Sequence, residues 1–239
     1  MKFFIILLLI VVKTSFVLSQ NIELLHGIEY NYGKVVRGDK SIARTTLSNK
    51  EPHQKFRFSF TPFKEKNITI IGSYHTVFPS VWMKLGNDDE IKNGPFIGNG
   101  SGKTRIHRFG LGGGYKVFLW KNRIIFNPRV ILNYEWAIQR WVPTSRSNSV
   151  GRYDFTMYSY SNPGYQIMPE IDIPLYFRIY KRLYLLLDYS FLWGHRPSMT
   201  MEVDYTIDGV PQPQATFVNN GTAHHAMIGL SYFFGKFKN

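Results

Sequence analysis

The chain of 239 residues contains no cysteine, which excludes disulfide bonds, a thiolate nucleophile and cysteine-ligated zinc. Beyond its first residues it contains no apolar run near the eighteen or so residues that suggest a membrane-spanning helix. It also lacks a basic helix or a compact Lys/Arg block, although its net charge is +13. Because the basic residues are dispersed over turns and polar strand faces, nucleic acid is not an expected partner.

The N-terminal segment has the pattern of an export signal. Lys2 precedes an apolar run over residues 3–12 that is too short to span a membrane as a helix. Residues that signal peptidases tolerate stand at the −3 and −1 positions before Gln20. We therefore predict a signal peptide over residues 1–19 and one domain over residues 20–239.

The remaining chain alternates apolar and polar residues, as strands with one apolar face do. The clearest example is a hairpin whose tight turn is Lys121-Asn122. Its apolar face carries Phe109, Leu111, Tyr115, Val117 and Leu119 before the turn, and Ile124, Phe126, Val130, Leu132, Tyr134 and Trp136 after it. Its strands run for roughly ten residues or more, about the length of a tilted strand that crosses a bilayer.

Eight such strands are predicted, separated by connections that alternate between short and long. The strands span about 22–35, 54–61, 67–78, 104–120, 123–137, 166–180, 183–193 and 223–234, and the long connections span about 36–53, 79–103, 138–165 and 195–222. This pattern predicts an all-β fold: an eight-stranded antiparallel up-and-down transmembrane β-barrel in the bacterial outer membrane. It would have short periplasmic turns, four long extracellular loops and both termini in the periplasm. The Gly, Ser, Asn and Pro content of the long connections predicts loops rather than helices there.

A water-soluble barrel of the lipocalin kind is the structural alternative, with the apolar face inside. An eight-stranded barrel has room only for packed side chains or one small ligand. Phe, Tyr, Trp, Leu and Ile on all eight strands are too bulky for that space, so we expect them outside.

The polar face carries charges of both signs. We predict a structural network of ion pairs in the lumen, because an unpaired buried charge is costly. Its expected members are Arg57, Lys116, Arg129, Glu135, Glu170, Asp172, Arg178 and Asp188, with Glu23, Glu29 and Arg108 on the same face. Glu170 and Asp172 could also serve as paired acid/base groups. A filled lumen argues against a pore for solutes.

No catalytic, cofactor or metal site is expected. The segment Gly98–Thr104 lacks one glycine of the phosphate-binding loop and leads into a strand rather than a helix. None of the seven histidines has the serine two residues later that barrel-type lipid A deacylases carry, and His224 and His225 point to opposite faces. The cluster Asp88-Asp89-Glu90, the best candidate for a cation or an omptin-like acidic site, is explained as a solvated turn.

Two segments resemble a known family. These are the hairpin FGLGGGYKVFLWKNRIIFNPRVILNYEW, from Phe109 to Trp136, and the ending HAMIGLSYFFGKF, from His225 to Phe237. They resemble the small outer-membrane β-barrels of Bacteroidetes type, relatives in shape of OmpA and OmpW barrels, with PorT-type barrels as a further relative. The ending is similar to the aromatic signal read by the barrel-assembly machinery, although residues 235–239 extend past it. The resemblance implies that machinery as a partner, and the dispersed positive charge favours outer-membrane lipids and lipopolysaccharide as further partners.

We therefore expect a non-enzymatic surface barrel without a cofactor, acting through its loops in surface binding, envelope integrity or partner docking. Arginine and aromatic residues are favoured binding anchors. The candidate contacts are Lys40, Arg44, Trp82, Lys103, Arg105, Trp141, Arg146, Tyr158 and Tyr160. Two alternatives stay open: an accessory subunit of a secretion or assembly complex, which would need a protein partner, and an enzyme that modifies lipid A.

Overall fold

A computed structural model describes residues 19–37, 43–45, 48–62, 67–77, 80–85, 96–100, 106–137, 144–150, 152–162 and 164–234. The predicted signal peptide, apart from Ser19, lies outside these residues. No helix in the described ranges is long and apolar enough to cross a membrane.

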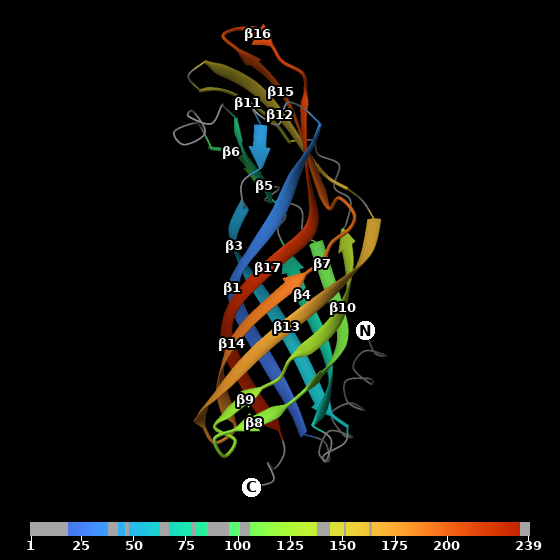
Figure 1. Ribbon diagram of the computed structural model, residues 1–239, viewed down its shortest axis with the longest axis vertical. Helices are drawn as coiled ribbons and strands as arrows, with labels where there is room; N and C mark the ends of the chain where they lie inside the picture. The colour runs from blue at the N-terminus through green and yellow to red at the C-terminus, as the bar shows by residue number, and fades with distance from the viewer. Residues whose placement is uncertain are drawn as a thin grey trace, which may run out of the picture.

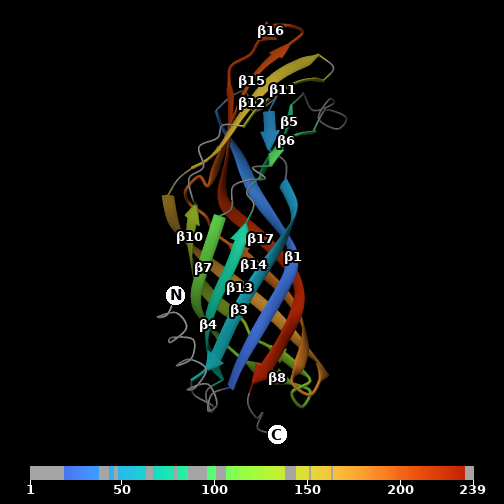
Figure 2. The same ribbon diagram turned by 180° about the vertical axis from the view of Figure 1, so that it is seen from behind.

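Eight strands form a closed antiparallel ring (Figures 1 and 2). In ring order they are β1 (Ser19–Arg37), β3 (Ser48–Thr61), β4 (Ile68–Val77), β7 (Ile106–Tyr115), β10 (Arg129–Ala137), β13 (Gly164–Tyr180), β14 (Leu183–Leu192) and β17 (Ala215–Phe234). The short strands β8 (Val117–Leu119) and β9 (Ile124–Phe126) prolong the β7–β10 hairpin. The first and last strands close the ring, with Gln20 opposite Phe234. The predicted eight-stranded barrel is confirmed.

The short turns lie together at one end of the barrel, its lower end in Figure 1. Trp120, Lys121 and Asn122 all have positive φ angles, of 49°, 51° and 63°, and Lys181 has a φ of 36°. Positive φ in the central residues gives a turn the twist that matches two antiparallel strands. These tight turns fix the registers of the β7–β10 and β13–β14 hairpins.

Bulky apolar side chains cover the outside of the ring. Every wall strand contributes at least one exposed example: Leu24, Phe56, Ile70, Leu111, Leu132, Ile171, Leu187 and Leu230. The alternate positions of the same strands point inward. They hold the buried charged and polar side chains, together with apolar ones such as Leu25, Ile71 and Leu186. The barrel is therefore inverted relative to a lipocalin-type barrel, as expected from side-chain size.

The described parts of the long connections contain strands and no helix, so they are not helices, as expected, but much of their length is regular strand instead of loop. The order β11 (Thr144–Val150), β12 (Tyr153–Ser161), β15 (Met199–Ile207), β17 extends the barrel sheet beyond its upper end (Figure 1). The strand β16 (Val210–Pro211) pairs with β15. We call β11, β12, β15, β16 and residues 215–222 of β17 the strand extension.

A separate three-stranded sheet stands beside the strand extension. It consists of β2 (Ala43–Thr45), β5 (Ser80–Leu85) and β6 (Phe96–Gly100), in the order β2-β5-β6. β5 approaches both β15 and β17, so residues from one further long connection lie against the extension, and β2 pairs with β5.

Candidate functional site in the lumen and the strand extension

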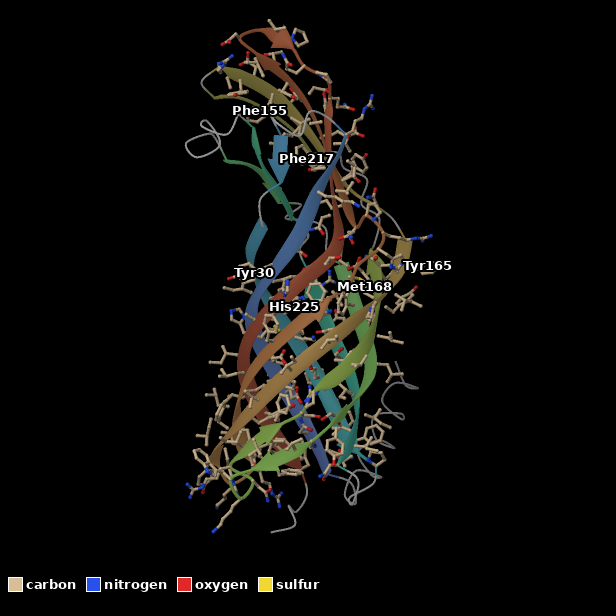
Figure 3. The ribbon with its side chains drawn as sticks, in the orientation of Figure 1. Tyr30, Phe155, Tyr165, Met168, Phe217 and His225 are labelled. Atoms are coloured by element: carbon tan, nitrogen blue, oxygen red, sulfur yellow. The ribbon has the colours of Figure 1, made fainter. Side chains whose placement is uncertain are left out.

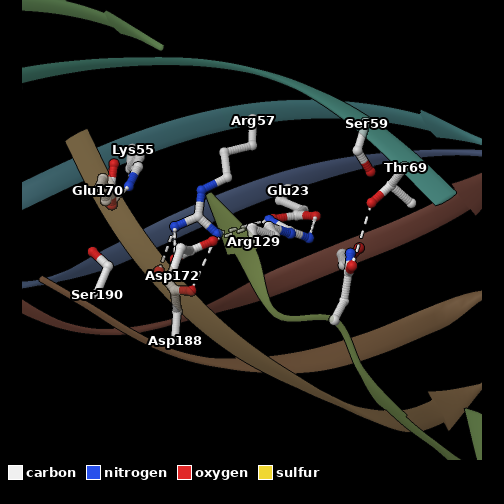
Figure 4. Close-up of polar contacts among 12 residues, drawn as sticks. Glu23, Lys55, Arg57, Ser59, Thr69, Arg129, Glu170, Asp172, Asp188 and Ser190 are labelled. Atoms are coloured by element: carbon white, nitrogen blue, oxygen red, sulfur yellow. Dashed lines mark hydrogen bonds and ion pairs between the residues drawn. The ribbon is translucent and has the colours of Figure 1, made fainter. Parts of the chain in front are cut away.

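The middle of the lumen holds a layer of ion pairs centred on Arg57 of β3 (Figure 4). Two of its guanidinium nitrogens face the two oxygens of Asp188, Nη2 at 2.5 Å and Nη1 at 3.1 Å. Nη2 also lies 2.9 Å from Asp172 Oδ1, and Nη1 lies 3.3 Å from Glu23 Oε2. All four side chains are almost completely buried. One arginine thus joins carboxylates from β1, β13 and β14.

Arg129 of β10 completes this layer. Its Nη2 and Nη1 donate to the two oxygens of Glu23 at 2.7 and 3.0 Å. This is the bidentate contact typical of a guanidinium and a carboxylate. Tyr176 donates its hydroxyl proton to Glu23 at 2.7 Å and is also in contact with Arg129. We call Glu23, Arg57, Arg129, Asp172 and Asp188 the central ion-pair layer.

A second group of charges lies above the central layer. Lys55 Nζ lies 2.5 Å from Glu170 Oε1, and Arg108 bridges Glu29 at 3.0 Å and Glu135 at 2.7 Å. The other oxygens of Glu170 and Glu135 are also bonded: Asn133 donates to Glu170, while Gln166 and Ser198 donate to Glu135. We call Glu29, Lys55, Arg108, Glu135 and Glu170 the upper ion-pair group.

Two of the predicted network residues lie elsewhere. Arg178 lies on the same inward-facing side of β13 as Asp172, but it is exposed because β13 continues past the charged part of the lumen to the turn. There, Arg178 Nε donates a hydrogen bond to the Lys181 carbonyl at 2.7 Å. Lys116 is buried, but it donates to Thr61 Oγ1 at 3.3 Å and lies 5.0 Å from the ring centroid of Phe233.

The other six predicted members, Arg57, Arg129, Glu135, Glu170, Asp172 and Asp188, are brought together in the lumen. The prediction omitted Lys55, although it shares a strand face with Arg57. It also omitted Tyr176, which the same alternation placed beside Asp172. In both cases the two-residue repeat of the strand carried the signal.

The lower part of the lumen contains an apolar cluster. Leu25, Ile125, Tyr176, Tyr184, Leu186, Met227 and Phe233 form one buried cluster there. Aromatic contacts hold it together, with the ring centroids of Tyr184 and Phe233 4.7 Å apart. Side chains therefore fill the space beneath the central ion-pair layer.

The strand extension has its own core. Tyr153, Phe155, Met157, Met199, Met201, Val203, Tyr205, Ala215 and Phe217 pack into one buried cluster. Figure 3 shows Phe155 and Phe217 in the extension, well above His225 in the barrel. A packed core gives the extension a defined surface instead of a set of independent loops.

Of the predicted contact residues, Tyr158 and Tyr160 lie on β12, on the side away from this core. Tyr158 is exposed, and Tyr160 donates to Glu202 Oε1 at 3.0 Å. The pKa of Tyr160 is raised, mainly by partial burial and also by this contact with the Glu202 carboxylate.

The other predicted contacts are placed only in part. Arg44, Trp82 and Arg146 lie on the strands β2, β5 and β11, respectively. Lys40, Lys103, Arg105 and Trp141, and the acidic cluster at residues 88–90, lie outside the described residues.

Comparison with known proteins gave structural matches only. No protein-family model and no curated protein matches the chain. The outer membrane protein OprG from Pseudomonas aeruginosa matches with a TM-score of 0.47 and 7% identity, over 91% of this chain and 96% of OprG. A major outer membrane protein from Thermus thermophilus matches with a TM-score of 0.48 and 9% identity, over 90% and 99%. Neisserial surface protein A matches with a TM-score of 0.39 and 10% identity, over 90% and 96%.

The class of protein follows from the strand pairing and the burial pattern. The chain is a closed eight-stranded antiparallel barrel with an apolar exterior, an ionised interior and a folded extension at one end.

Proposed function

We propose that this protein is a non-enzymatic barrel of the bacterial outer membrane that acts through its strand extension. The observation that carries the proposal is the reversed burial pattern. Large apolar side chains face outward on all eight strands, while the charges are inside. Water-soluble proteins rarely expose so continuous an apolar surface, whereas a barrel in lipid requires one.

In this proposal the short turns and both chain termini face the periplasm, after removal of the signal peptide, and the strand extension faces the outside. The resemblance to small Bacteroidetes-type barrels, relatives of OmpA and OmpW barrels, belongs to the same proposal. Lipopolysaccharide and outer-membrane lipids would surround the wall, and the barrel-assembly machinery would insert it.

The lumen supports a binding role rather than conduction. The central ion-pair layer spans the ring and the apolar cluster fills the space beneath it. A solute would have to displace buried, paired charges, which is energetically costly.

The extension offers two features that suit partner binding. Tyr158 is an exposed aromatic side chain on a packed sheet, a favoured kind of binding anchor. Among the described strands, β11 pairs only with β12, so its other edge can accept a strand from another protein. This edge of β11 favours the alternative in which the protein is an accessory subunit, since a subunit would also act by binding a partner protein.

A complementation experiment tests the proposal. A deletion strain would be complemented with the wild-type chain, with Tyr158→Ala, or with the control Tyr180→Ala, whose exposed ring lies at the opposite end. We expect surface binding or secretion to be lost on deletion, weakened by Tyr158→Ala and restored by Tyr180→Ala. Equal complementation by both variants would contradict the role of the Tyr158 face.

Two further measurements on these strains separate the alternatives. A membrane protein that co-purifies stoichiometrically with the wild-type chain would identify an accessory subunit. Mass spectrometry of lipid A tests the enzymatic alternative, since an altered profile in the deletion strain would contradict a purely non-enzymatic role.

A further inference from the structure

Three buried side chains from neighbouring strands meet above the central ion-pair layer. They are Glu29 on β1, His53 on β3 and His225 on β17, each at most 2% exposed. His225 Nε2 lies 2.9 Å and His53 Nδ1 lies 3.8 Å from Glu29 Oε2, and one ligand atom from each residue falls within 4.8 Å of the others. Figure 3 shows His225 within the barrel.

The outer nitrogen of each imidazole has its own partner. His53 Nε2 lies 3.1 Å from His75 Nδ1, and His225 Nδ1 lies 2.9 Å from Ser190 Oγ and 3.8 Å from Glu170 Oε1. A proton on each outer nitrogen, donated to these partners, leaves the lone pairs of His53 Nδ1 and His225 Nε2 directed at Glu29. Metal-binding histidines commonly donate the proton of their other ring nitrogen to such an acceptor, which fixes the orientation of the ring.

Among the described residues of the lumen, the buried carboxylates outnumber the buried lysines and arginines by one. The six carboxylates are Glu23, Glu29, Glu135, Glu170, Asp172 and Asp188, and the five basic groups are Lys55, Arg57, Arg108, Lys116 and Arg129, beside the buried histidines His53, His75 and His225. Arg108 Nη1 approaches Glu29 Oε2 at 3.0 Å, while Glu29 Oε1 is buried without a hydrogen-bond partner among the described residues. Both imidazole nitrogens and Arg108 thus approach the same oxygen, Oε2. A cation between the imidazoles would share Oε2 with Arg108, and Oε1 can bind it as the second oxygen of the same carboxylate.

We propose that Glu29, His53 and His225 bind one divalent transition-metal ion of the zinc type. Two imidazoles and one carboxylate form a ligand set that such ions favour, with a fourth position left open. Glu29 and His225 are directly opposite each other across the pair formed by the first and last strands. The ion would therefore join β1, β3 and β17 at the seam where the ring closes, and it does not depend on the role of the strand extension.

Zinc titration of the purified, refolded barrel tests the site. Isothermal calorimetry with Zn²⁺ should show one ion per wild-type chain, and Co²⁺ should give the visible absorption of a four-coordinate site. His225→Ala and His53→Ala should each weaken binding by at least about tenfold. His107→Ala is the matched control, because His107 lies on β7 outside this cluster with its ring against Tyr74, and it should bind as the wild type does.

Heat-dependent mobility on gels shows whether each variant is folded. If an alanine variant does not fold, Glu29→Gln, which keeps the shape of the side chain, replaces it in the zinc titration. Absence of zinc binding in the wild type would overturn the proposal. Unchanged binding in folded His225→Ala or Glu29→Gln would overturn it as well. So would nitrogen NMR showing that both nitrogens of His225 stay protonated at saturating Zn²⁺, because a proton would then supply the missing charge.

Discussion

Replacing Arg57 should be among the most damaging single changes in the barrel. Arg57 is fully buried and is the direct partner of Asp188, Asp172 and Glu23. In Arg57→Met, Arg129 still contacts Glu23 and Asp172, but Asp188 loses the group that bonded both of its oxygens. Removing one partner of a buried ion pair costs about 3–5 kcal/mol of unfolding free energy. Because folded domains are stable by only about 5–15 kcal/mol, the barrel should be severely weakened.

Urea unfolding of the refolded barrel, followed by gel mobility and tryptophan fluorescence, measures the loss. With a slope of about 2 kcal/mol per molar urea, the midpoint should fall by about 1.5 M or more. Arg178→Met is the matched control, because Arg178 has the same chemistry and inward parity but is exposed. Its effect should stay within about 0.5 kcal/mol. Equal midpoints for the two variants would refute the reasoning.

A compensated variant separates charge from packing. When Asp188→Leu is added to Arg57→Met, the charge that was left without a partner is removed as well. Replacing a whole buried pair with apolar groups of similar size is often neutral or stabilising. The urea midpoint of the double variant should therefore return most of the way to the wild-type value. A midpoint below that of Arg57→Met would show that packing, not charge, caused the loss of stability.

Three other predictions concern the wall and the lumen. Gly112→Val should prevent refolding, because a Cβ there would lie 2.2 Å from the Val130 carbonyl oxygen. Gly113→Ala should fold normally in the same gel assay, because the nearest atom to its Cβ would be 3.5 Å away. Leu111→Lys, exposed midway along β7, should cost about 2–4 kcal/mol in lipid vesicles, and Tyr180→Lys at the lower end about 1 kcal/mol or less. The wild-type barrel in planar bilayers should show no steady ion conductance, and stable open channels would contradict a filled lumen.

The wall strands could be predicted because their alternation is long and strict. Between Phe109 and Leu119, for example, aromatic and aliphatic residues face one side and glycine or charge the other. A pattern of that length fits only a strand with one face in an apolar environment. The strand extension was missed although Tyr153, Phe155 and Met157 alternate in the same way, because glycine, serine and proline interrupt the surrounding sequence.

The height of a side chain in the lumen could not be predicted. Alternation places Arg57 and Arg178 on inward faces, yet one lies in the central ion-pair layer and the other at an open end. Height depends on the stagger between strands, which tight turns fix only for hairpins. No turn joins β1 to β17, so neither alternation nor turn length could predict that Glu29 lies opposite His225.

The ion pairs also supply connections that the backbone cannot. Among the eight described wall strands, backbone hydrogen bonds join each strand to its two neighbours in the ring, whereas Arg57 on β3 reaches Asp188 on β14 across the lumen. Arg129 on β10 likewise reaches Glu23 on β1. Each contact is satisfied only when strands from opposite sides of the ring stand at the correct relative height. The buried charges therefore select one stagger of the ring, because any slip would leave ions without partners in a space that excludes water.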